Sequence, residues 1–266
     1  MGNESFIKQH SLAIYFVLVF LIAWVGSFVA VGSKFLQGRA IEFSDVGLMS
    51  LPMLLAPFIS GLVMSYLSDR EGIRELFGRM KIWKVGGRWF FPLLVFPALL
   101  VCVSLVLTDF WSAEFALTFN SFGLFGGILA GLLEETGWTG FAFPRMIRKT
   151  SIIKASVYLG VIHGVWHLMA DFLGNYYALG GFWLPYFIGF VLHVVALRVL
   201  IGWVYANTGS LLLAVLMHFS STGFYGTLIS TTLSPESRMI FYITYGIVLC
   251  VTASIVALKY GKNLKT

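Results

Sequence analysis

The chain has 266 residues, of which 58% are hydrophobic and only 11% are charged. Soluble domains carry about 25% charged residues, so this composition excludes a globular surface that faces water. The formal net charge of +6 does not indicate a nucleic-acid-binding protein, because the cations lie in short loops between long apolar stretches. We therefore expect an integral membrane protein whose partner is the lipid bilayer, with no nucleic-acid partner.

Eight apolar stretches follow one another along the chain, and each can cross a hydrocarbon core of about 30 Å as a helix. They cover approximately 11–31, 46–67, 89–107, 122–143, 151–170, 185–205, 209–230 and 240–258. The first is too long for a signal-peptide core, so we expect it to be retained. The sequence predicts an all-α fold, a polytopic membrane bundle of about eight transmembrane helices that forms a single transmembrane domain over residues 1–266.

Cations are concentrated in alternate loops. If the N-terminus is cytoplasmic, the inner segments hold 15 of the 18 Lys and Arg residues, and the outer loops hold only Lys34, Arg39 and Arg238. The positive-inside rule then predicts both termini in the cytoplasm, and we expect the plasma membrane of a prokaryote. The inner loop at 69–88 has apolar residues at helical spacing between its cations. This spacing favours a short amphipathic helix at the membrane surface, with a solvated basic loop as the alternative.

Several ionisable residues lie inside the predicted helices, where a charge is expensive and marks a functional site by default. They are Glu134 and Glu135 in the fourth helix, His163 and His167 in the fifth, His193 in the sixth and His218 in the seventh. A rise of about 1.5 Å per residue places Glu134, His167 and His218 at similar depths in the bilayer. We therefore predict one intramembrane site built from at least three helices.

Helical spacing decides which of these side chains share a face. Glu135 shares a face with Thr139, and Glu134 shares one with Trp138. His163 and His167 are four residues apart, which suits either a pair of metal ligands or a stacked hydrogen-bond relay. A lone histidine such as His193 is more often a hydrogen-bond donor between helices than a catalytic group.

Two hydrolytic chemistries are compatible with these residues. A carboxylate in a poorly solvated pocket can act as general base on a water that a histidine helps to hold. Alternatively, Glu134, His167 and His218 could bind a divalent metal such as zinc, whose bound water would be the nucleophile. No cofactor is certain on this basis. The HExxH motif of zinc proteases and the GxSxG motif of serine hydrolases are both absent from the sequence.

Three segments in the C-terminal half carry a family resemblance. They read EETGWTGFAFPRM at 134–146, HGVWH at 163–167 and LMHFSST at 216–222, the last preceded by Thr-Gly-Ser at 208–210. In this order they resemble the motifs of the CPBP family: EExxxR, FxxxH, and a histidine followed four residues later by asparagine. These membrane proteases include the type II CAAX prenyl endopeptidases and bacteriocin-processing or self-immunity proteins. The protease-like motifs lie within residues 134–222.

The resemblance implies a role for each matched residue. Glu134 would activate the water, His167 would help to hold it, and Glu135 would be a supporting carboxylate. His218 would line the oxyanion hole, and Thr222 takes the place of the asparagine in that motif. The remaining matched positions, His163, Trp138 and Thr139, would line the substrate pocket.

Three positions depart from the family pattern. Thr139 replaces the arginine of the first motif, His163 replaces the phenylalanine of the second, and Thr222 replaces the asparagine of the third. Without the motif arginine, Glu135 is expected to be protonated or paired with another cation, for which Arg198 and Arg145 are the candidates.

The resemblance predicts an intramembrane endopeptidase that cleaves a peptide or lipidated protein substrate, with cleavage near the C-terminus of prenylated or other membrane-associated proteins as the expected reaction. Two alternatives stay open. The first is a non-catalytic self-immunity or scaffold protein that kept the protease fold, which the threonines at 139 and 222 favour. The second is a proton-coupled transporter, because intramembrane Glu and His residues also form proton relays.

Overall fold

The computed structural model describes residues 6–68 and 72–265, which form helices and connecting loops with no strand among them. The α-helices are α1 (Phe6–Gln9), α2 (Ser11–Leu36), α3 (Phe43–Ser68), α4 (Gly72–Met80), α5 (Val95–Phe110), α6 (Ser121–Gly137), α7 (Phe143–Ile147), α8 (Ile152–Trp166), α9 (Leu168–Leu179), α10 (Trp183–Thr208), α11 (Leu211–Leu228) and α12 (Pro235–Tyr260). Three short 3₁₀ segments, η1 (Gly87–Leu94), η2 (Ala113–Phe115) and η4 (Gly180–Phe182), and one π-helical segment, η3 (Trp138–Ala142), connect them. The predicted all-α class is confirmed.

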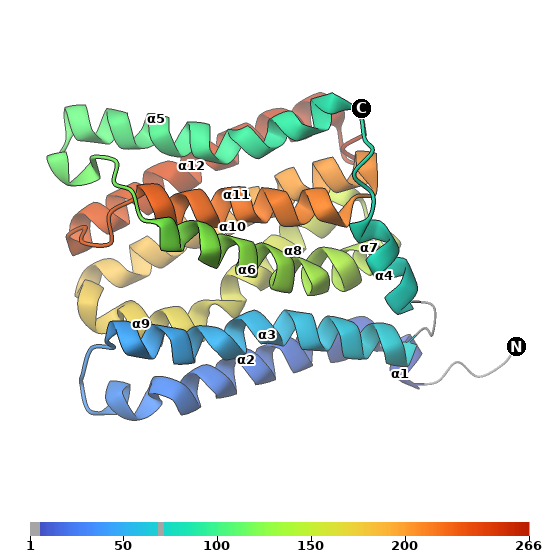
Figure 1. Cartoon of the computed structure of the whole chain (residues 1–266), viewed down its shortest axis with the longest axis horizontal. Coiled ribbons are helices and arrows are strands. Elements are labelled where there is room, and N and C mark those ends of the chain that lie inside the picture. Colours follow the sequence, from blue (N-terminus) through green and yellow to red (C-terminus); the bar gives the residue numbers. More distant parts are fainter. Residues whose placement is uncertain (1–5, 69–71, 266) are drawn as a thin grey trace, which may run out of the picture.

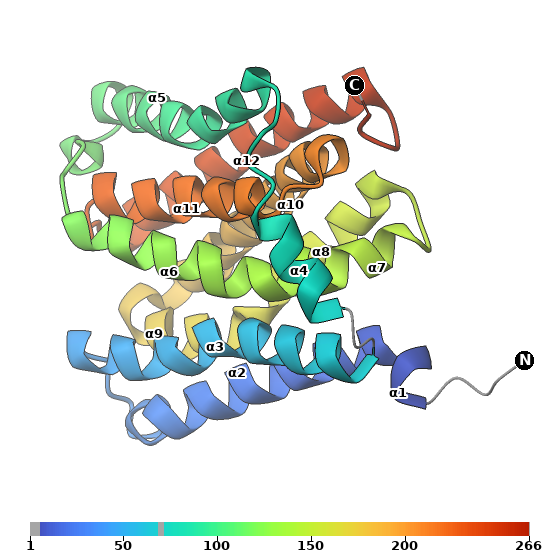
Figure 2. The same ribbon diagram turned by 45° about the vertical axis from the view of Figure 1, so that its right-hand side comes forward.

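The long helices lie side by side along the long axis of the molecule (Figure 1). The pair α2 and α3 forms one side of the bundle, α5 and α12 form the opposite side, and α6, α8, α10 and α11 lie between them (Figure 2). Helix α1 and the last turn of α12 lie at the same end of the bundle, as expected for an even number of crossings. Within the inner loop at 69–88, the predicted amphipathic helix is present as α4 over Gly72–Met80 and lies at this end, while residues 69–71 lie outside the described residues.

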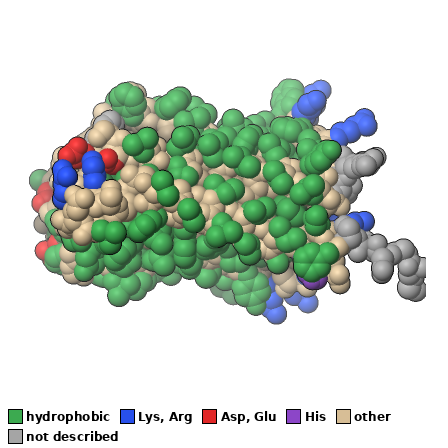
Figure 3. Space-filling model, turned by 90° about the horizontal axis from the view of Figure 1, so that it is seen from below, with side chains coloured by type: hydrophobic (Ala, Val, Ile, Leu, Met, Phe, Trp, Pro, Cys, Tyr) green, Lys and Arg blue, Asp and Glu red, His purple; other side chains and the backbone are tan. Residues whose placement is uncertain are grey.

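Six helical stretches among the described residues are long and apolar enough to cross a membrane. They are Ser11–Leu36, Ser44–Ser68, Gly87–Phe110, Leu168–Thr208, Leu211–Leu228 and Pro235–Tyr260. Figure 3 shows the hydrophobic side chains that cover the middle of one face, with charged side chains at its two ends. The polytopic membrane class is therefore confirmed, while the predicted eight spans are only approximate.

The difference arises at the two predicted helices that carry the glutamates and two of the histidines. Helix α6 gives way to the π-helical segment η3 after Gly137, and α8 is interrupted at His167 before α9 begins. Each is therefore shorter than its apolar stretch, at 17 and 15 residues. The interruptions fall where the candidate site lies.

A stripe of glycines brings α6 against α11. Gly123, Gly127 and Gly131 recur every four residues, which places them on one face of α6. A Cβ atom on Gly127 would lie 2.4 Å from Cα of Gly223, and one on Gly131 would lie 2.6 Å from the carbonyl oxygen of Val215. Small residues permit such close backbone approach, a common device in membrane bundles. Glu135 is the next residue in this series of four, so the stripe directs its side chain toward α11.

Candidate active site

Glu134 and Glu135 occupy the last turn of α6, directly before the π-helical segment η3. Single π-helical turns inside α-helices are rare and occur frequently at functional sites. Both glutamates are buried, with exposed fractions of 4% and 0%. Their carboxylates must therefore find partners on other helices rather than in water.

The helix that carries His163 is interrupted at His167, between α8 and α9. The backbone carbonyl of Trp166 accepts a hydrogen bond of 2.9 Å from Nε1 of Trp24 on α2. A polar backbone group beside the break thus has a partner inside the protein, as a membrane-embedded break requires. His163 is buried, whereas His167 is partly exposed.

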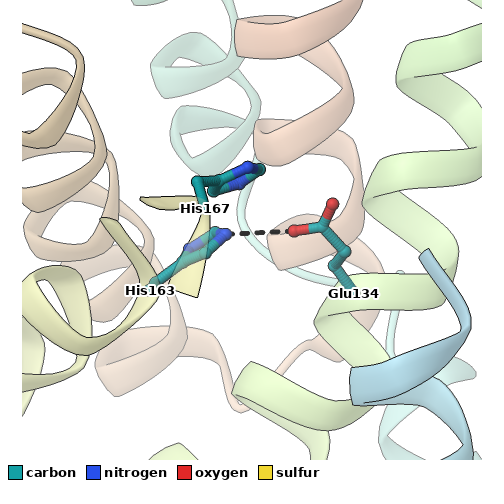
Figure 4. Close-up of side chains that lie close together, drawn as sticks. All are labelled: Glu134, His163 and His167. Carbon is teal, nitrogen blue, oxygen red and sulfur yellow. Dashed lines mark hydrogen bonds and ion pairs between the residues drawn. The ribbon is translucent and has the colours of Figure 1, made fainter. Parts of the chain in front are cut away.

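Glu134 faces three histidines. Its Oε2 lies 3.0 Å from Nε2 of His163 (Figure 4) and 3.9 Å from Nε2 of His218. The ring of His167 stacks on that of His163 with 5.3 Å between the centroids. Trp138 covers His163 from another side, at 5.0 Å between the ring centroids.

Glu135 is held by three hydrogen-bonding side chains from three helical segments. Arg198 of α10 forms a two-point ion pair with it, in which Nη1 lies 2.8 Å from Oε2 and Nη2 contacts Oε1. Nδ1 of His218 on α11 lies 2.6 Å from Oε1, and Oγ1 of Thr139 donates to Oε2 at 2.5 Å. A buried carboxylate that is fully hydrogen-bonded and ion-paired in this way avoids the cost of an uncompensated charge.

The two glutamates belong to one hydrogen-bonded network. Arg198 contacts Glu135 and also places Nε 3.1 Å from Nδ1 of His163, which in turn contacts Glu134. The network holds two carboxyl groups and one guanidinium, so it can stabilise one additional proton. This combination of a buried carboxylate, adjacent imidazoles and an internal cation is suited to proton transfer.

The chain matches the sequence profile of a known protease family. The profile described as Type II CAAX prenyl endopeptidase Rce1-like matches residues 89–224, which are 136 of the 266 residues and include α6, α8 and α10. The chain belongs to this family. It is also 27% identical over 233 residues to the CAAX prenyl protease 2 of Methanococcus maripaludis, covering 79% of this chain and 82% of that relative. The resemblance to the CAAX protease family drawn from three motifs is thereby confirmed.

Membership in the Rce1-like family supports a multi-pass, membrane-embedded endopeptidase that acts on protein substrates. Most residues singled out in the sequence of this family member meet in one buried cluster. Glu134, Glu135, His163, His167, His218, Trp138 and Thr139 all lie in the network or directly against it. His163 is more central than a wall of the pocket, because it contacts Glu134 directly.

The sequence analysis placed Thr222 in the site of this Rce1-like protein, but the structure does not bring it there. The structure places it on an exposed face of α11, outside the network. The preceding residue, Ser221, is fully buried and lies 2.8 Å from Nε2 of His193 through its Oγ. His193 thus joins α10 to α11, in agreement with the structural role expected for it.

Of the two candidate partners for Glu135, the structure selects Arg198. Arg145 instead donates to the carbonyl oxygen of Phe141 at 3.0 Å and lies over the Phe141 ring, 3.7 Å from its centroid. The 15 cations assigned to the inner segments from the sequence include Arg198, and this assignment is wrong for Arg198, because it is 2% exposed in the interior of α10. For an isolated arginine near the end of an apolar stretch, the sequence does not distinguish a loop cation from a buried partner of a carboxylate.

Three residues of this Rce1-like site lie close enough together to hold a metal ion. Glu134, His163 and His167 each present one ligand atom, and these atoms lie within 4.8 Å of one another. This limit includes the spacing of roughly 3.4 Å between ligand atoms in a tetrahedral zinc site. A metal-bound histidine also donates its second ring N–H to an acceptor, whereas Nδ1 of His163 faces an arginine, which can only donate. His218, which the sequence analysis grouped with Glu134 and His167 as candidate ligands, is not among these three, although its Nε2 lies 3.9 Å from Oε2 of Glu134.

Proposed function

We propose that this Rce1-like protein hydrolyses a peptide bond with Glu134 as the general base for water, without a metal ion. The observation that carries the proposal is the position of the Glu134 carboxylate, which is buried and faces His163 and His167 (Figure 4). A water hydrogen-bonded to two groups separates their atoms by roughly 4.5 Å. The Glu134 oxygen and the His167 nitrogen lie within 4.8 Å of each other, a range that includes this spacing.

The proposed reaction moves one proton at a time. Glu134 takes a proton from the water, whose oxygen attacks the carbonyl carbon of the scissile bond. Glu134 then passes this proton to the amide nitrogen, the C–N bond breaks, and the amine leaves. In Figure 4 the second carboxylate oxygen of Glu134 points away from His163, and we propose that this oxygen contacts the water.

His218 is the proposed donor to the oxyanion. With Nδ1 on Glu135, its Nε2 is the ring nitrogen directed toward Glu134 and the reacting atoms. When this nitrogen carries a proton, it can donate to the negative oxygen of the tetrahedral intermediate. The resulting imidazolium would lie beside two carboxylates and one guanidinium, which balances the charge of the network.

The proposed substrate is a lipidated or otherwise membrane-associated protein, cleaved near its C-terminus. The name of the Methanococcus maripaludis relative, CAAX prenyl protease 2, supports a prenylated substrate. We further propose that both termini are cytoplasmic and that the protein resides in the plasma membrane of a prokaryote. A prenyl chain would anchor such a substrate in the bilayer, so its C-terminal peptide could approach the partly exposed His167.

The first test is cleavage of prenylated peptides by purified wild-type protein and by Glu134→Gln in detergent. We expect Glu134→Gln to lose activity by at least a factor of about 100, because general-base catalysis contributes roughly 10²–10⁴-fold. Glu236→Gln is the matched control, since Glu236 is exposed in the first turn of α12, outside the network. A metal chelator should leave wild-type cleavage unchanged.

Each outcome separates the alternatives. Wild-type cleavage that survives Glu134→Gln would exclude this residue as the base. Loss of activity on chelation, with restoration by zinc, would instead support the metal-dependent chemistry. If neither protein cleaves any member of a broad peptide panel, while a cellular phenotype tolerates Glu134→Gln, the non-catalytic alternative would be favoured.

A further inference from the structure

Arg198 uses all three of its guanidinium nitrogens inside the network. Nη1 and Nη2 bind the two oxygens of Glu135, and Nε lies 3.1 Å from Nδ1 of His163. The side chain is 1% exposed, and Oγ1 of Thr139 lies 3.5 Å from Nη1. The planar guanidinium fixes the directions of its N–H groups, so holding Glu135 in a two-point pair also fixes the direction of the Nε–H bond.

This arrangement decides where His163 carries its proton. An arginine nitrogen can only donate, so Nδ1 of His163 must accept the hydrogen bond from Nε. The single proton of a neutral imidazole then lies on Nε2, which is 3.0 Å from Oε2 of Glu134. His163 is therefore a donor to the glutamate, and it cannot rotate its ring without losing both contacts.

We propose that Arg198 is a positioning residue for Glu134 that acts through His163. The guanidinium holds His163 in the tautomer with the proton on Nε2, and this N–H directs one carboxylate oxygen of Glu134 and leaves the other to water. The same guanidinium holds Glu135, which in turn binds Nδ1 of His218. One side chain on α10 thereby orients partners of both glutamates on α6. The inference rests on the proposed function of Glu134, but the first experiment below, which measures the tautomer of His163, does not depend on that function.

The first readout is the tautomer of His163, measured by ¹⁵N NMR of histidine-labelled protein in lipid nanodiscs. The chain has five histidines, and the His163→Gln variant identifies the signal that belongs to position 163. In the wild type we expect a protonated Nε2 and an unprotonated Nδ1. In Arg198→Lys, whose ammonium keeps the charge but lacks the fixed fork, we expect a mixture of tautomers.

The second readout is the rate of cleavage. Arg198→Lys should lower kcat roughly 10- to 100-fold, the loss expected for one hydrogen bond to a charged group, while KM changes less than about twofold. Arg145→Lys is the matched control, because Arg145 is a partly buried arginine that contacts Phe141 rather than the network. It should leave both the His163 tautomer and kcat near the wild-type values.

The proposal would be overturned by a wild-type His163 that carries its proton on Nδ1. It would also be overturned if Arg198→Lys left both the tautomer and kcat unchanged. A wild type with the expected tautomer but no proteolytic activity would contradict the proposed function and leave the contact between Arg198 and His163 intact.

A second pair of variants covers the case in which Arg198→Lys does not fold. His163→Gln keeps an N–H that can reach Glu134, whereas His163→Phe removes it and keeps an aromatic ring of similar volume. We expect His163→Gln to retain more of kcat than His163→Phe. Equal rates in the two variants, with both proteins folded, would contradict a role for the His163 N–H in directing Glu134.

Discussion

At the scale of single residues, the site depends on Arg198, a buried arginine that pairs with Glu135 in place of the arginine of the family motif. Thr139 stands where the family motif has an arginine, and its hydroxyl donates to Glu135 while Arg198 supplies the positive charge from another helix. Removing one partner of a buried ion pair is costly, because the remaining charge keeps no compensation. Removing the side chain of Glu135 or of Arg198 should therefore destabilise the protein more than removing the hydroxyl of Thr139.

A pair of threonine variants tests which motif residues belong to the network. Thr139→Val removes a buried hydroxyl that donates to a carboxylate, and we expect a loss of about 1–3 kcal/mol in the free energy of unfolding. Thr222→Val removes an exposed hydroxyl on α11 and should change stability by less than about 0.5 kcal/mol. Thermal unfolding of both purified variants in the same detergent measures the difference. Equal destabilisation would place Thr222 back in the site.

The sequence predicted which residues gather at the candidate site, but it did not predict which of them contact one another. Charges and histidines inside apolar stretches are rare, so Glu134, Glu135, His167 and His218 were recognisable from their cost in lipid alone. The contact between His163 and Glu134 was not recognisable, because it depends on the relative rotation of two helices. For the same reason, the sequence could not decide whether Arg198 or Arg145 pairs with Glu135.

At the scale of helices, glycine spacing on α6 positions the glutamates against α11. At Gly127 this close approach predicts that alanine destabilises the protein, whereas helix propensity predicts that alanine stabilises it. Alanine favours helix over glycine by about 1 kcal/mol, so propensity alone would make both Gly126→Ala and Gly127→Ala stabilising. A Cβ at Gly127 would lie 2.4 Å from the backbone of Gly223, whereas one at Gly126 would have no atom within 4 Å.

We therefore expect Gly127→Ala to destabilise the protein by about 1–3 kcal/mol, as overpacking does, and Gly126→Ala to be neutral or slightly stabilising. Thermal unfolding in detergent is the measurement. The Gly127 variant should also lose cleavage activity, because separation of α6 from α11 would lengthen the contact between Glu135 and His218. A fully active and equally stable Gly127→Ala protein would contradict the close packing of these helices.

The helix interruptions at the site were the part of the fold that the sequence did not predict. Apolar residues lie on both sides of Gly137 and of His167, so both stretches read as unbroken spans. The break at His167 depends on a distant donor, Trp24 on α2, which contacts the carbonyl of Trp166. Such a partner becomes visible only when helices separated by more than a hundred residues pack together.

At the scale of the whole molecule, the two ends of the bundle differ in their charge. The end that carries α1 and the last turn of α12 also carries the cations of α4 and α7. At the opposite end, Lys34 forms a 2.7 Å ion pair with Asp45, and Arg238 binds Asn175. Moving Arg198 from the loops into the site leaves this asymmetry in place, so the positive-inside rule still predicts cytoplasmic termini.

Labelling with a membrane-impermeant maleimide tests this orientation in intact cells. Single cysteines are introduced at two exposed positions, Thr232 between α11 and α12 and Lys149 between α7 and α8, after Cys102 and Cys250 are changed to alanine. We expect Thr232→Cys to react in intact cells and Lys149→Cys to react only after permeabilisation, because the basic end remains in the cytoplasm. The reverse pattern would place the termini outside. It would also require substrates to reach His167 from the opposite side of the membrane, which would exclude cytoplasmic prenylated proteins as the substrate class.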